Sequence, residues 1–459
     1  MRFKPAAGPR PLAPIIITIF LLLAACRGEN NTPLPSLPAG VLNLSKSQTL
    51  SFSPAIAASG NVLYAAWTDS EGPQNMEVFL SRSGDGGASF SAPMNISQSV
   101  NFSGNPKLAL SGSNLYVVWE EFIPTNTSEN NETDIFYRRA DDQNGTLVWD
   151  APKNLSLSGL ICGTAPKSGP CPSQGAAITA AGNNVYVAWA EATDYVISPI
   201  TVGGSATKFD LINSDILMVQ SFDGGVTFSP APITLSGFKT GNSLSPSLNP
   251  ALASSGPTLY VAWEDFLQPN SKILFRRGPD PANGVFFPDL TLPALIRSGS
   301  IKGPNRPGLA AEGAQVTLLW EGVSPADTGS GCPELDPATG QPFPHSEIFL
   351  IGSADQGFSF TDPDVAQSNL SNTPCHSNSG RIAVSLPSVY VAWEDKTPGT
   401  RGILFKKSAD GGATFGAVET LSQTAGSASN AAIASSGTSL FAVWEDSTLG
   451  NLEIFFTRR

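Results

Sequence analysis

The sequence is poor in charge and almost devoid of histidine. Asp, Glu, Lys and Arg make up 14% of its 459 residues, and only 2 residues are histidine. A soluble domain usually carries about 25% charged residues. The formal net charge is −12, to which Arg2, Lys4 and Arg10 contribute +3, so the chain beyond residue 25 carries −15. This balance excludes nucleic acid as a partner, because a polyanion is bound by a basic surface that displaces its counterions.

The sequence also lacks a sustained apolar period near 3.6 residues after residue 26, which argues against a helical fold. Its 44 glycines and 38 prolines are spread along the whole chain rather than collected in linkers. This distribution predicts many short strands joined by tight turns. A chain of 459 residues would ordinarily suggest several domains, but an internal repeat overrides that expectation.

The N-terminus reads as an export signal. Basic residues precede an apolar stretch, Ile15 to Leu23, that is too short to span a bilayer as an uncleaved anchor. The segment Leu23-Ala24-Ala25-Cys26 resembles the lipobox of bacterial lipoproteins, which implies cleavage and acylation of Cys26. Position 27 is Arg rather than Asp, which favours the outer membrane where the organism has one. We therefore predict a signal peptide at 1–26, a flexible tether at 27–40 and one extracytoplasmic domain at 41–459, held to the membrane only by lipid.

Four cysteines remain after Cys26, namely Cys162, Cys171, Cys332 and Cys375. An even number in an oxidising compartment indicates disulfides. Of the three connectivities, we favour 162 with 171 and 332 with 375. The only histidines, His345 and His376, lie near the second pair, so a Cys2His2 zinc site is the alternative, although the spacing fits no zinc-finger pattern.

One strand recurs seven times and ends in Trp followed by acid. Its copies are "LYAAWTD" from 63, "LYVVWEE" from 115, "VYVAWAE" from 185, "LYVAWED" from 259, "VTLLWEG" from 316, "VYVAWED" from 389 and "LFAVWED" from 440. A strand rich in small residues precedes each copy, one such as "EIFLIGS" from 347 follows it, and a fourth leads to segments such as "KNLS" at 153. Four short strands per repeat predict an all-β, seven-bladed β-propeller of antiparallel blades.

The last repeat stops at its third strand, because Arg459 follows "EIFFTR" directly. The segment "LNLSKS" from 42 copies the fourth strand and precedes the first repeat. We therefore expect the N-terminal strand to complete the seventh blade and remove its open edge.

Between strands three and four, four repeats share the pattern Ser-x-Asp-x-Gly-x-Ser/Thr-Phe, and two degenerate copies begin at 140 and 278. The Asp can accept amides of its own turn, the Gly can adopt positive φ, and the Phe can pin the hairpin to its blade. The pattern resembles the Asp-box, or BNR repeat, of the sialidase-like propeller superfamily over residues 42–459. The resemblance implies structural turns away from any active site, with a six-bladed sialidase-type ring as the alternative. The residues concerned are Ser83, Asp85, Gly87, Phe90, Ser221, Asp223, Gly225, Phe228, Ser353, Asp355, Gly357, Phe360, Ser408, Asp410, Gly412 and Phe415.

Length variation is expected on one face only. Insertions at 122–133, 192–214 and 322–346 follow strand two, and those at 157–174 and 371–379 follow strand four; both classes leave the same face. Variable loops on a rigid scaffold indicate a binding face, and loops that simply cap the channel are the alternative. The same face gathers the acids that follow each Trp, which either make structural hydrogen bonds or, for a subset, bind calcium. The calcium candidates are Glu264, Asp265, Glu394, Asp395, Glu445 and Asp446.

A sialidase would require an arginine triad, a tyrosine nucleophile with an acidic partner, and an Asp acid/base, as the resemblance implies. Tyr195 is the one tyrosine outside the repeat strands, and Glu191 lies near it in sequence. Arg306 and Arg381 begin first strands, but "NRPG" and "GRIA" match the family's Phe-Arg-Ile-Pro motif poorly. We therefore predict a monomeric, non-catalytic module that binds glycan or protein through its acidic loop face, without a cofactor other than calcium. An exo-sialidase or other glycoside hydrolase is the alternative, and a purely structural envelope protein is the third reading.

Overall fold

The computed structural model describes residues 35–70, 75–123, 132–156, 161–162, 169–170, 172–202, 205–236, 246–267, 270–278, 290–291, 302–324, 332, 345–361, 369–397 and 399–459. These residues form thirty strands and no helix. Within them, no helix is long and apolar enough to cross a membrane. The predicted signal peptide and Cys26 lie outside the described residues.

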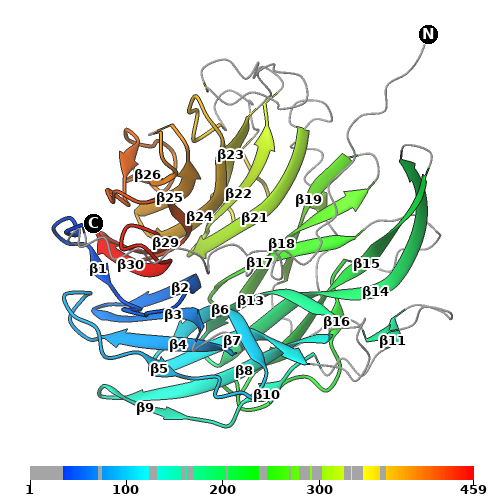
Figure 1. Ribbon diagram of the computed structural model, residues 1–459, viewed down its shortest axis with the longest axis horizontal. Coiled ribbons are helices and arrows are strands. Elements are labelled where there is room, and N and C mark those ends of the chain that lie inside the picture. Colours follow the sequence, from blue (N-terminus) through cyan, green and yellow to red (C-terminus); the bar gives the residue numbers. More distant parts are fainter. Residues whose placement is uncertain are drawn as a thin grey trace.

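The strands form seven antiparallel blades arranged in a ring, as predicted (Figure 1). The six-bladed alternative is therefore wrong. Each blade is a meander in which consecutive strands pair, with the first strand innermost. The first strands of adjacent blades contact one another all around the ring, and β2 contacts β28 where the ring closes.

The strands of blades 1 to 3 are, in chain order, β2 (Ser51–Ser59), β3 (Val62–Ser70), β4 (Met76–Ser83) and β5 (Met94–Asn95); β6 (Phe102–Ser111), β7 (Asn114–Ile123), β8 (Glu132–Gln143), β9 (Thr146–Trp149) and β10 (Lys153–Asn154); and β13 (Ser173–Ala181), β14 (Asn184–Val202), β15 (Ser205–Ser221) and β16 (Ile233–Thr234). A small hairpin, β11 (Ile161–Cys162) with β12 (Gly169–Pro170), lies between blades 2 and 3 in the chain.

The strands of blades 4 to 7 are β17 (Ser247–Ser255), β18 (Thr258–Leu267), β19 (Asn270–Gly278) and β20 (Leu290–Thr291); β21 (Lys302–Glu312), β22 (Gln315–Val323) and β23 (Ser346–Ser353); β24 (Ser377–Ser385), β25 (Ser388–Asp395), β26 (Gly402–Ser408) and β27 (Glu419–Thr420); and β28 (Ala428–Ser436), β29 (Ser439–Asp446), β30 (Glu453–Arg458) and β1 (Leu42–Asn43). In blade 5 the fourth strand is reduced to a bridge between Phe349 and Asn369.

The second strand of each blade is buried on both faces, which explains its nearly continuous apolar sequence. In β25 all eight residues are buried. Seven hydrophobic clusters fill the seven spaces between adjacent blades, and each Trp of the repeat packs toward the blade before it. Burying one such aromatic side chain removes about 150–250 Å² from water, or about 4–6 kcal/mol of transfer free energy. The contacts between blades therefore constitute the core.

The ring closes as predicted. Leu42 and Asn43 of β1 pair with Phe456 and Phe455 of β30. The Glu453 carboxylate accepts hydrogen bonds from the Asn43 amide at 2.8 Å and the Ser45 hydroxyl at 3.0 Å. The N-terminal segment thus supplies both the edge strand and the polar end of blade 7.

Removing residues 1–47 should lower the free energy of unfolding by about 3–6 kcal/mol relative to a chain lacking residues 1–34. The reason is that Val41 and Leu44, which are 7% and 5% exposed, leave the core, and each contributes about 1.5–3 kcal/mol when fully buried. Urea denaturation of the two chains measures the difference. Equal unfolding midpoints would mean that the ring does not depend on β1.

Candidate ligand-binding site

The two ends of the ring differ in their connections. The turns between strands one and two and between strands three and four share one end, which we call the turn face. Hydrogen bonds join the two kinds of turn, for example from the Gly86 N–H to the Asn61 carbonyl at 2.9 Å and from the Gly224 N–H to the Asn183 carbonyl at 2.9 Å. The remaining connections leave the opposite end, the loop face. A disulfide between Cys332 and Cys375 joins the two classes of loop-face connection.

The four Ser-x-Asp-x-Gly segments form closed turns on the turn face. In the first, the Ser83 hydroxyl donates to Asp85 at 2.7 Å and accepts the Gly87 N–H at 2.9 Å. The Asp85 carboxylate also accepts the Ser89 N–H at 3.0 Å and the Ser89 hydroxyl at 2.5 Å. The turns at Asp223, Asp355 and Asp410 repeat these contacts.

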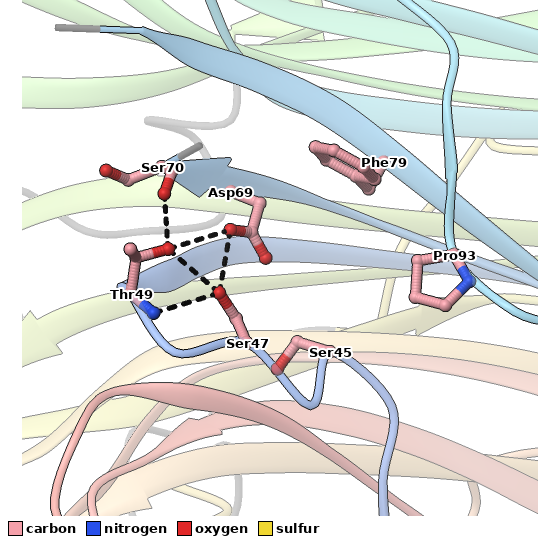
Figure 2. Close-up of a pocket in the computed structure, with 7 residues that line it drawn as sticks. All are labelled: Ser45, Ser47, Thr49, Asp69, Ser70, Phe79 and Pro93. Carbon is pink, nitrogen blue, oxygen red and sulfur yellow. Dashed lines mark hydrogen bonds between the residues drawn. The ribbon is translucent and has the colours of Figure 1, made fainter. Parts of the chain in front are cut away.

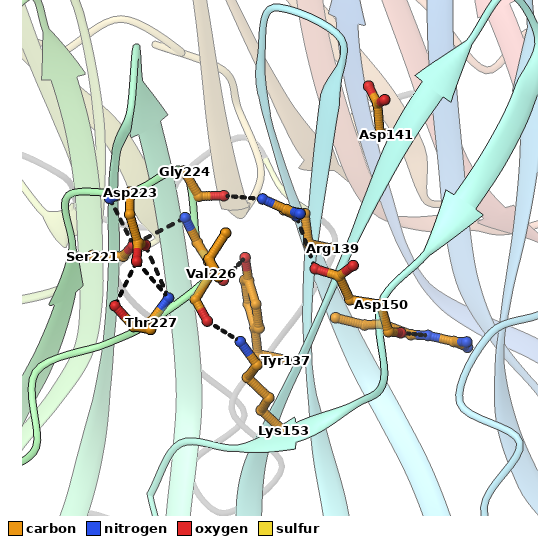
Figure 3. A network of polar contacts seen from close by, with 12 residues as sticks. Tyr137, Arg139, Asp141, Asp150, Lys153, Ser221, Asp223, Gly224, Val226 and Thr227 are labelled. Carbon is orange, nitrogen blue, oxygen red and sulfur yellow. Dashed lines mark hydrogen bonds and ion pairs between the residues drawn. The ribbon is translucent and has the colours of Figure 1, made fainter.

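The glycines of three of these turns, Gly87, Gly225 and Gly357, face side chains of the preceding blade. Gly225 has φ of 80°, and a Cβ there would lie 1.9 Å from the Tyr137 hydroxyl, so the neighbouring blade and the backbone both require glycine. The Phe228 ring packs edge-on against Tyr137 with centroids 4.8 Å apart. Arg139 donates to the Gly224 carbonyl at 3.1 Å, and Lys153 donates to the Val226 carbonyl (Figure 3). We expected the Phe to pin the hairpin to its own blade, but it packs across the boundary between blades.

The degenerate copy in blade 2 makes the same kind of contact by other means. Residues 140–149 form the hairpin between β8 and β9, whose Asp142 accepts hydrogen bonds from the Tyr64 hydroxyl and from Arg82 Nε, the latter at 2.7 Å. Both partners belong to blade 1. The other degenerate copy, from 278, lies almost entirely outside the described residues.

The acid two residues after each Trp is a structural acceptor. The indole N–H of Trp189 donates to Glu191 at 2.7 Å, and the Ser173 hydroxyl of the first strand donates to the same oxygen at 2.5 Å. The indoles of Trp67, Trp119, Trp393 and Trp444 donate likewise to Asp69, Glu121, Asp395 and Asp446. In blade 5 this position is Gly322, and the buried Trp320 indole N–H has no hydrogen-bond partner among the described residues.

The acid directly after the Trp ties its blade to the next one. Glu394 accepts the Asn430 N–H at 2.7 Å, and Glu445 accepts the Ser53 N–H at 2.7 Å. Each donor stands at a bulge of the next first strand with positive φ. This bulge recurs in all seven blades, with φ from 48° to 65°, at Ser53, Asn105, Gly175, Asn249, Arg306, Ser379 and Asn430. Glu120, Glu264 and Glu321 accept the corresponding N–H groups of the following blades.

The expectation of an exposed acidic face is therefore wrong for these carboxylates. Ten of the acids after the Trp are buried, at no more than 9% exposure, and only Glu120 is half-buried. Because successive side chains of a strand point to opposite sides, the two acids of each calcium candidate pair turn apart, one toward its own blade and one toward the next blade. The described residues contain no group of three or more metal-ligating side chains.

A further repeated contact escaped the sequence analysis. The Ser of the "NLS" segment donates to an acid at the start of strand three, at 3.0 Å from Ser156 to Asp134 and at 2.6 Å from Ser236 to Asp215. The same hydroxyl accepts a strand N–H, as from Ile135 at 3.0 Å. The signal is present in the sequence, because five of the seven repeat segments equivalent to "EIFLIGS" begin with Asp or Glu.

Two cations depart from the repeat at the central axis. One register position of the first strand, just after the bulge, holds small residues in five blades but Lys107 in blade 2 and Arg381 in blade 6. The five small residues are Ala55, Ala177, Ala251, Gly308 and Ala432. Lys107 and Arg381 occupy this position opposite Val118 and Ala392.

Neither cation has a carboxylate partner. The Lys107 ammonium donates to the Pro106 carbonyl at 3.3 Å, and Arg381 Nη1 donates to the Gly380 carbonyl at 3.0 Å. Among the described residues these are their only hydrogen bonds, and neither forms an ion pair. Burial and then the positive charge of Arg381 lower the pKa of Lys107 to about 8, against an opposing effect of Glu120. Lys107 nevertheless remains exposed, so protein surrounds its ammonium without sealing it from water.

Of the candidate catalytic residues, the structure brings the two arginines together. Arg306 is 56% exposed and lies 3.7 Å from Glu321, and its charge acts on Arg381. Burial is the main cause that lowers the pKa of Arg381; the charges of Glu321 and Glu394 oppose this shift, and the charge of Arg306 adds to it. Glu191 is occupied by its Trp and Ser partners. Tyr195 lies on β14, paired with Ile212, rather than in a loop, because the insertion at 192–214 extends the β14–β15 hairpin.

The cysteine predictions are resolved for one pair. The disulfide between Cys332 and Cys375 is confirmed, with Cα atoms 4.9 Å apart. These sulfurs therefore cannot serve as thiolate ligands of zinc. The rings of His345 and His376 lie nearby in an edge-on pair with centroids 5.0 Å apart. The pair 162 with 171 lies outside the described side chains.

An open groove of about 420 Å³ runs along the seam between blades 7 and 1. Figure 2 shows that the Ser47 and Thr49 hydroxyls converge on the Asp69 carboxylate, at 3.0 and 3.2 Å. Phe79 and Pro93 form the apolar wall. Because these hydroxyl and carboxylate groups hydrogen-bond to one another, fewer unpaired hydrogen-bond donors face the groove than face the central axis.

Replacing Glu394 by Ala should lower the free energy of unfolding by about 1–3 kcal/mol, the usual cost of leaving a buried donor unpaired. The orphaned donor would be the Asn430 N–H. The Glu394→Gln variant keeps an acceptor and should lose less than half as much. Chemical denaturation compares the two, and equal losses would show that the carboxylate acts through its charge instead.

Stability should fall as the pH drops from about 4 through about 2, because of the turn aspartates. Hydrogen bonds from Thr414, then from its N–H and Ser408, lower the pKa of Asp410 to about 2, and the pKa of Asp355 is also lowered to about 2. A carboxyl whose pKa is depressed on folding stabilises above its unfolded pKa and ceases to do so as it protonates. The Asp410→Asn variant should flatten the acid limb of the stability profile, whereas an unchanged limb would contradict the assignment.

No protein-family model matches the sequence, and no curated protein matches it. Solved structures share the fold. An ulvan lyase from a family of polysaccharide lyases aligns with 90% of this chain and 93% of its own, at 10% identity and a TM-score of 0.54.

Two sialidases are also similar. Trypanosoma rangeli sialidase in complex with sialic acid is 12% identical over 92% of this chain, with a TM-score of 0.45, and the match spans only 59% of that sialidase. A Hadza microbial sialidase is 15% identical over 84% of this chain and 74% of its own, with a TM-score of 0.45. The chain is thus a seven-bladed propeller that shares its fold with a polysaccharide lyase.

Proposed function

We propose that this protein is an envelope lipoprotein, anchored through Cys26, whose propeller binds acidic carbohydrate at its central axis without catalysing a reaction. The observation that supports the proposal most is the pair of unpaired cations, Lys107 and Arg381, on first strands that elsewhere hold alanine or glycine. A monomer suffices, since the ring completes itself.

A bound anion would offset the unfavourable interaction between the two cations at the central axis. Two like charges near one another, each held only by a carbonyl of its own strand, disfavour each other's charged form. A carboxylate or sulfate placed between them would accept charge-assisted hydrogen bonds, to which a guanidinium is well suited. The charges of Glu321 and Glu394 favour the charged form of Arg381, but neither carboxylate forms an ion pair with it in the described part of the chain, and each already accepts a backbone N–H of the next blade.

Carbohydrate is favoured over other anions for two reasons. The net charge of −12 opposes long-range attraction of any polyanion, so an acidic ligand must be held by the local cation pair together with uncharged contacts, which a saccharide can provide. The ulvan lyase propeller, which matches most of this chain, has been solved bound to -[GlcA(1-4)Rha3S]-, a saccharide with acidic groups. At 10% identity that match supports the fold, and the binding chemistry is our extension.

A glycoside hydrolase remains the second candidate, favoured by the approach of Arg306 to Arg381. It would need Tyr195 and an acidic partner at the same place. Glu191, four residues away along β14, is separated from Tyr195 by about 13 Å of strand and is committed to its own blade. Hydrolysis of a fluorogenic sialoside, abolished by Tyr195→Phe, would establish this alternative.

Replacing Lys107 or Arg381 by Ala should weaken binding of polygalacturonate at least 10-fold, whereas Lys46→Ala, which removes an exposed lysine near β1, should not. Affinity of the unaltered protein should decline as the pH rises through about 8, where Lys107 loses its proton. Isothermal titration of the full chain, with and without calcium, measures both effects. Binding that is indifferent to both cations would refute the axis as the site, and a requirement for calcium would revive a metal-bridged mode.

A further inference from the structure

An aromatic pair stands at the loop-face end of blade 2. Phe102 begins β6 and Phe122 lies near the end of β7, directly opposite it in the ladder. Their ring centroids are 6.0 Å apart, and Phe102 is 40% exposed. The preceding Val100 is 98% exposed. Neither phenylalanine belongs to any of the seven clusters between blades in the described structure.

The fold does not require aromatic residues at this position. The equivalent pair is Leu50 with Ser70 in blade 1, Pro172 with Ala192 in blade 3, Pro246 with Phe266 in blade 4 and Ser427 with Ser447 in blade 7, as their backbone hydrogen bonds show. Only blade 2 presents two rings there among these blades. An exposed apolar group that the scaffold does not need indicates a contact surface.

The pair shares its strand with one of the axis cations. Phe102 and Lys107 are both on β6, five residues apart, or about 16 Å at the rise of an extended strand. Between Val100 and Phe102, the half-buried Asn101 has no side-chain hydrogen bond within the described part of the chain. A free amide, an aromatic ring and a cation thus follow one another along the chain, at Asn101, Phe102 and Lys107, from the rim of the loop face to the axis.

We infer that Phe102 and Phe122 form a stacking subsite for a sugar ring of an acidic polysaccharide whose charged group occupies the Lys107–Arg381 pair. This inference rests on the proposed function and extends it from a single anion to a chain. The C–H face of a sugar carries partial positive charge and packs on the electron-rich face of a ring, while the Asn101 amide can bond a hydroxyl. Binding of a protein would not explain why two phenylalanine rings stand at the rim while a cation lies about 16 Å further along the strand, at about 3.3 Å per residue.

The test is binding of the full chain to three polymers: polygalacturonate, dextran sulfate and neutral dextran. Phe102→Ala and Phe122→Ala should each weaken binding to the preferred acidic polymer about 10-fold and leave the dependence of affinity on salt unchanged. Lys107→Ala should reduce that salt dependence, because it removes a charge contact. Phe358→Ala is the matched control, since Phe358 is 58% exposed on the turn face and should have no effect.

The outcomes separate the two proposals. Acidic-polymer binding that requires Lys107 but ignores both phenylalanines would overturn the subsite alone. Binding of neutral dextran that requires the phenylalanines but not Lys107 would overturn the proposed function and the acidic ligand class together. No binding to any of the three polymers by a folded chain would overturn both. Preference for polygalacturonate over dextran sulfate, or the reverse, assigns the anion as carboxylate or sulfate.

Discussion

A blade of this ring cannot bury its own two faces, so the contact between adjacent blades is the interaction on which the rest of the structure depends. Each interface contains an apolar cluster built around the Trp of one blade, and polar contacts at the ends of the blades add to it. At the loop face a glutamate after the Trp accepts a bulge N–H of the next blade, as Glu394 does from Asn430. At the turn face the Phe and Gly of an Asp turn pack against the preceding blade, as Phe228 and Gly225 do against Tyr137. Because the ring is closed, every blade packs against a neighbouring blade on both sides.

This constraint explains why most of the polar residues that look functional are structural. A recurring acid costs free energy when buried unless it is hydrogen-bonded, and here the repeat supplies the same donors each time. Burial raises the pKa of Glu264, Glu321 and Glu445, which the backbone and asparagine donors partly offset. Ligand binding is therefore better sought where one blade departs from the others than where all blades agree. Lys107, Arg381 and the Phe102–Phe122 pair are departures of this kind.

The sequence was sufficient for the blade count, the ring closure by residues 42–43 and the Cys332–Cys375 disulfide. Each of these depends on local spacing or on a repeat that can be aligned by eye. It was not sufficient for the acids after the Trp, which were expected to form an exposed surface. Their burial depends on a bulge in the next blade and on the alternation that sends neighbouring carboxylates apart. That bulge is 36 to 58 residues away in the chain for four of the glutamates, and 392 residues away for Glu445, where the ring closes.

The two cations at the axis also could not be recognised as a pair from the sequence. In the sequence Lys107 is an ordinary lysine in "PKLAL", and nothing nearby marks it. Lys107 stands out only in the closed ring, because ring closure brings blades 2 and 6 close enough for the charge of Arg381 to lower the pKa of Lys107. Five blades show that Ala or Gly satisfies this register position, so two unpaired charges there are not needed to hold the ring together. A position that is electrostatically unfavourable in the free protein and unnecessary for folding is best explained by what it binds.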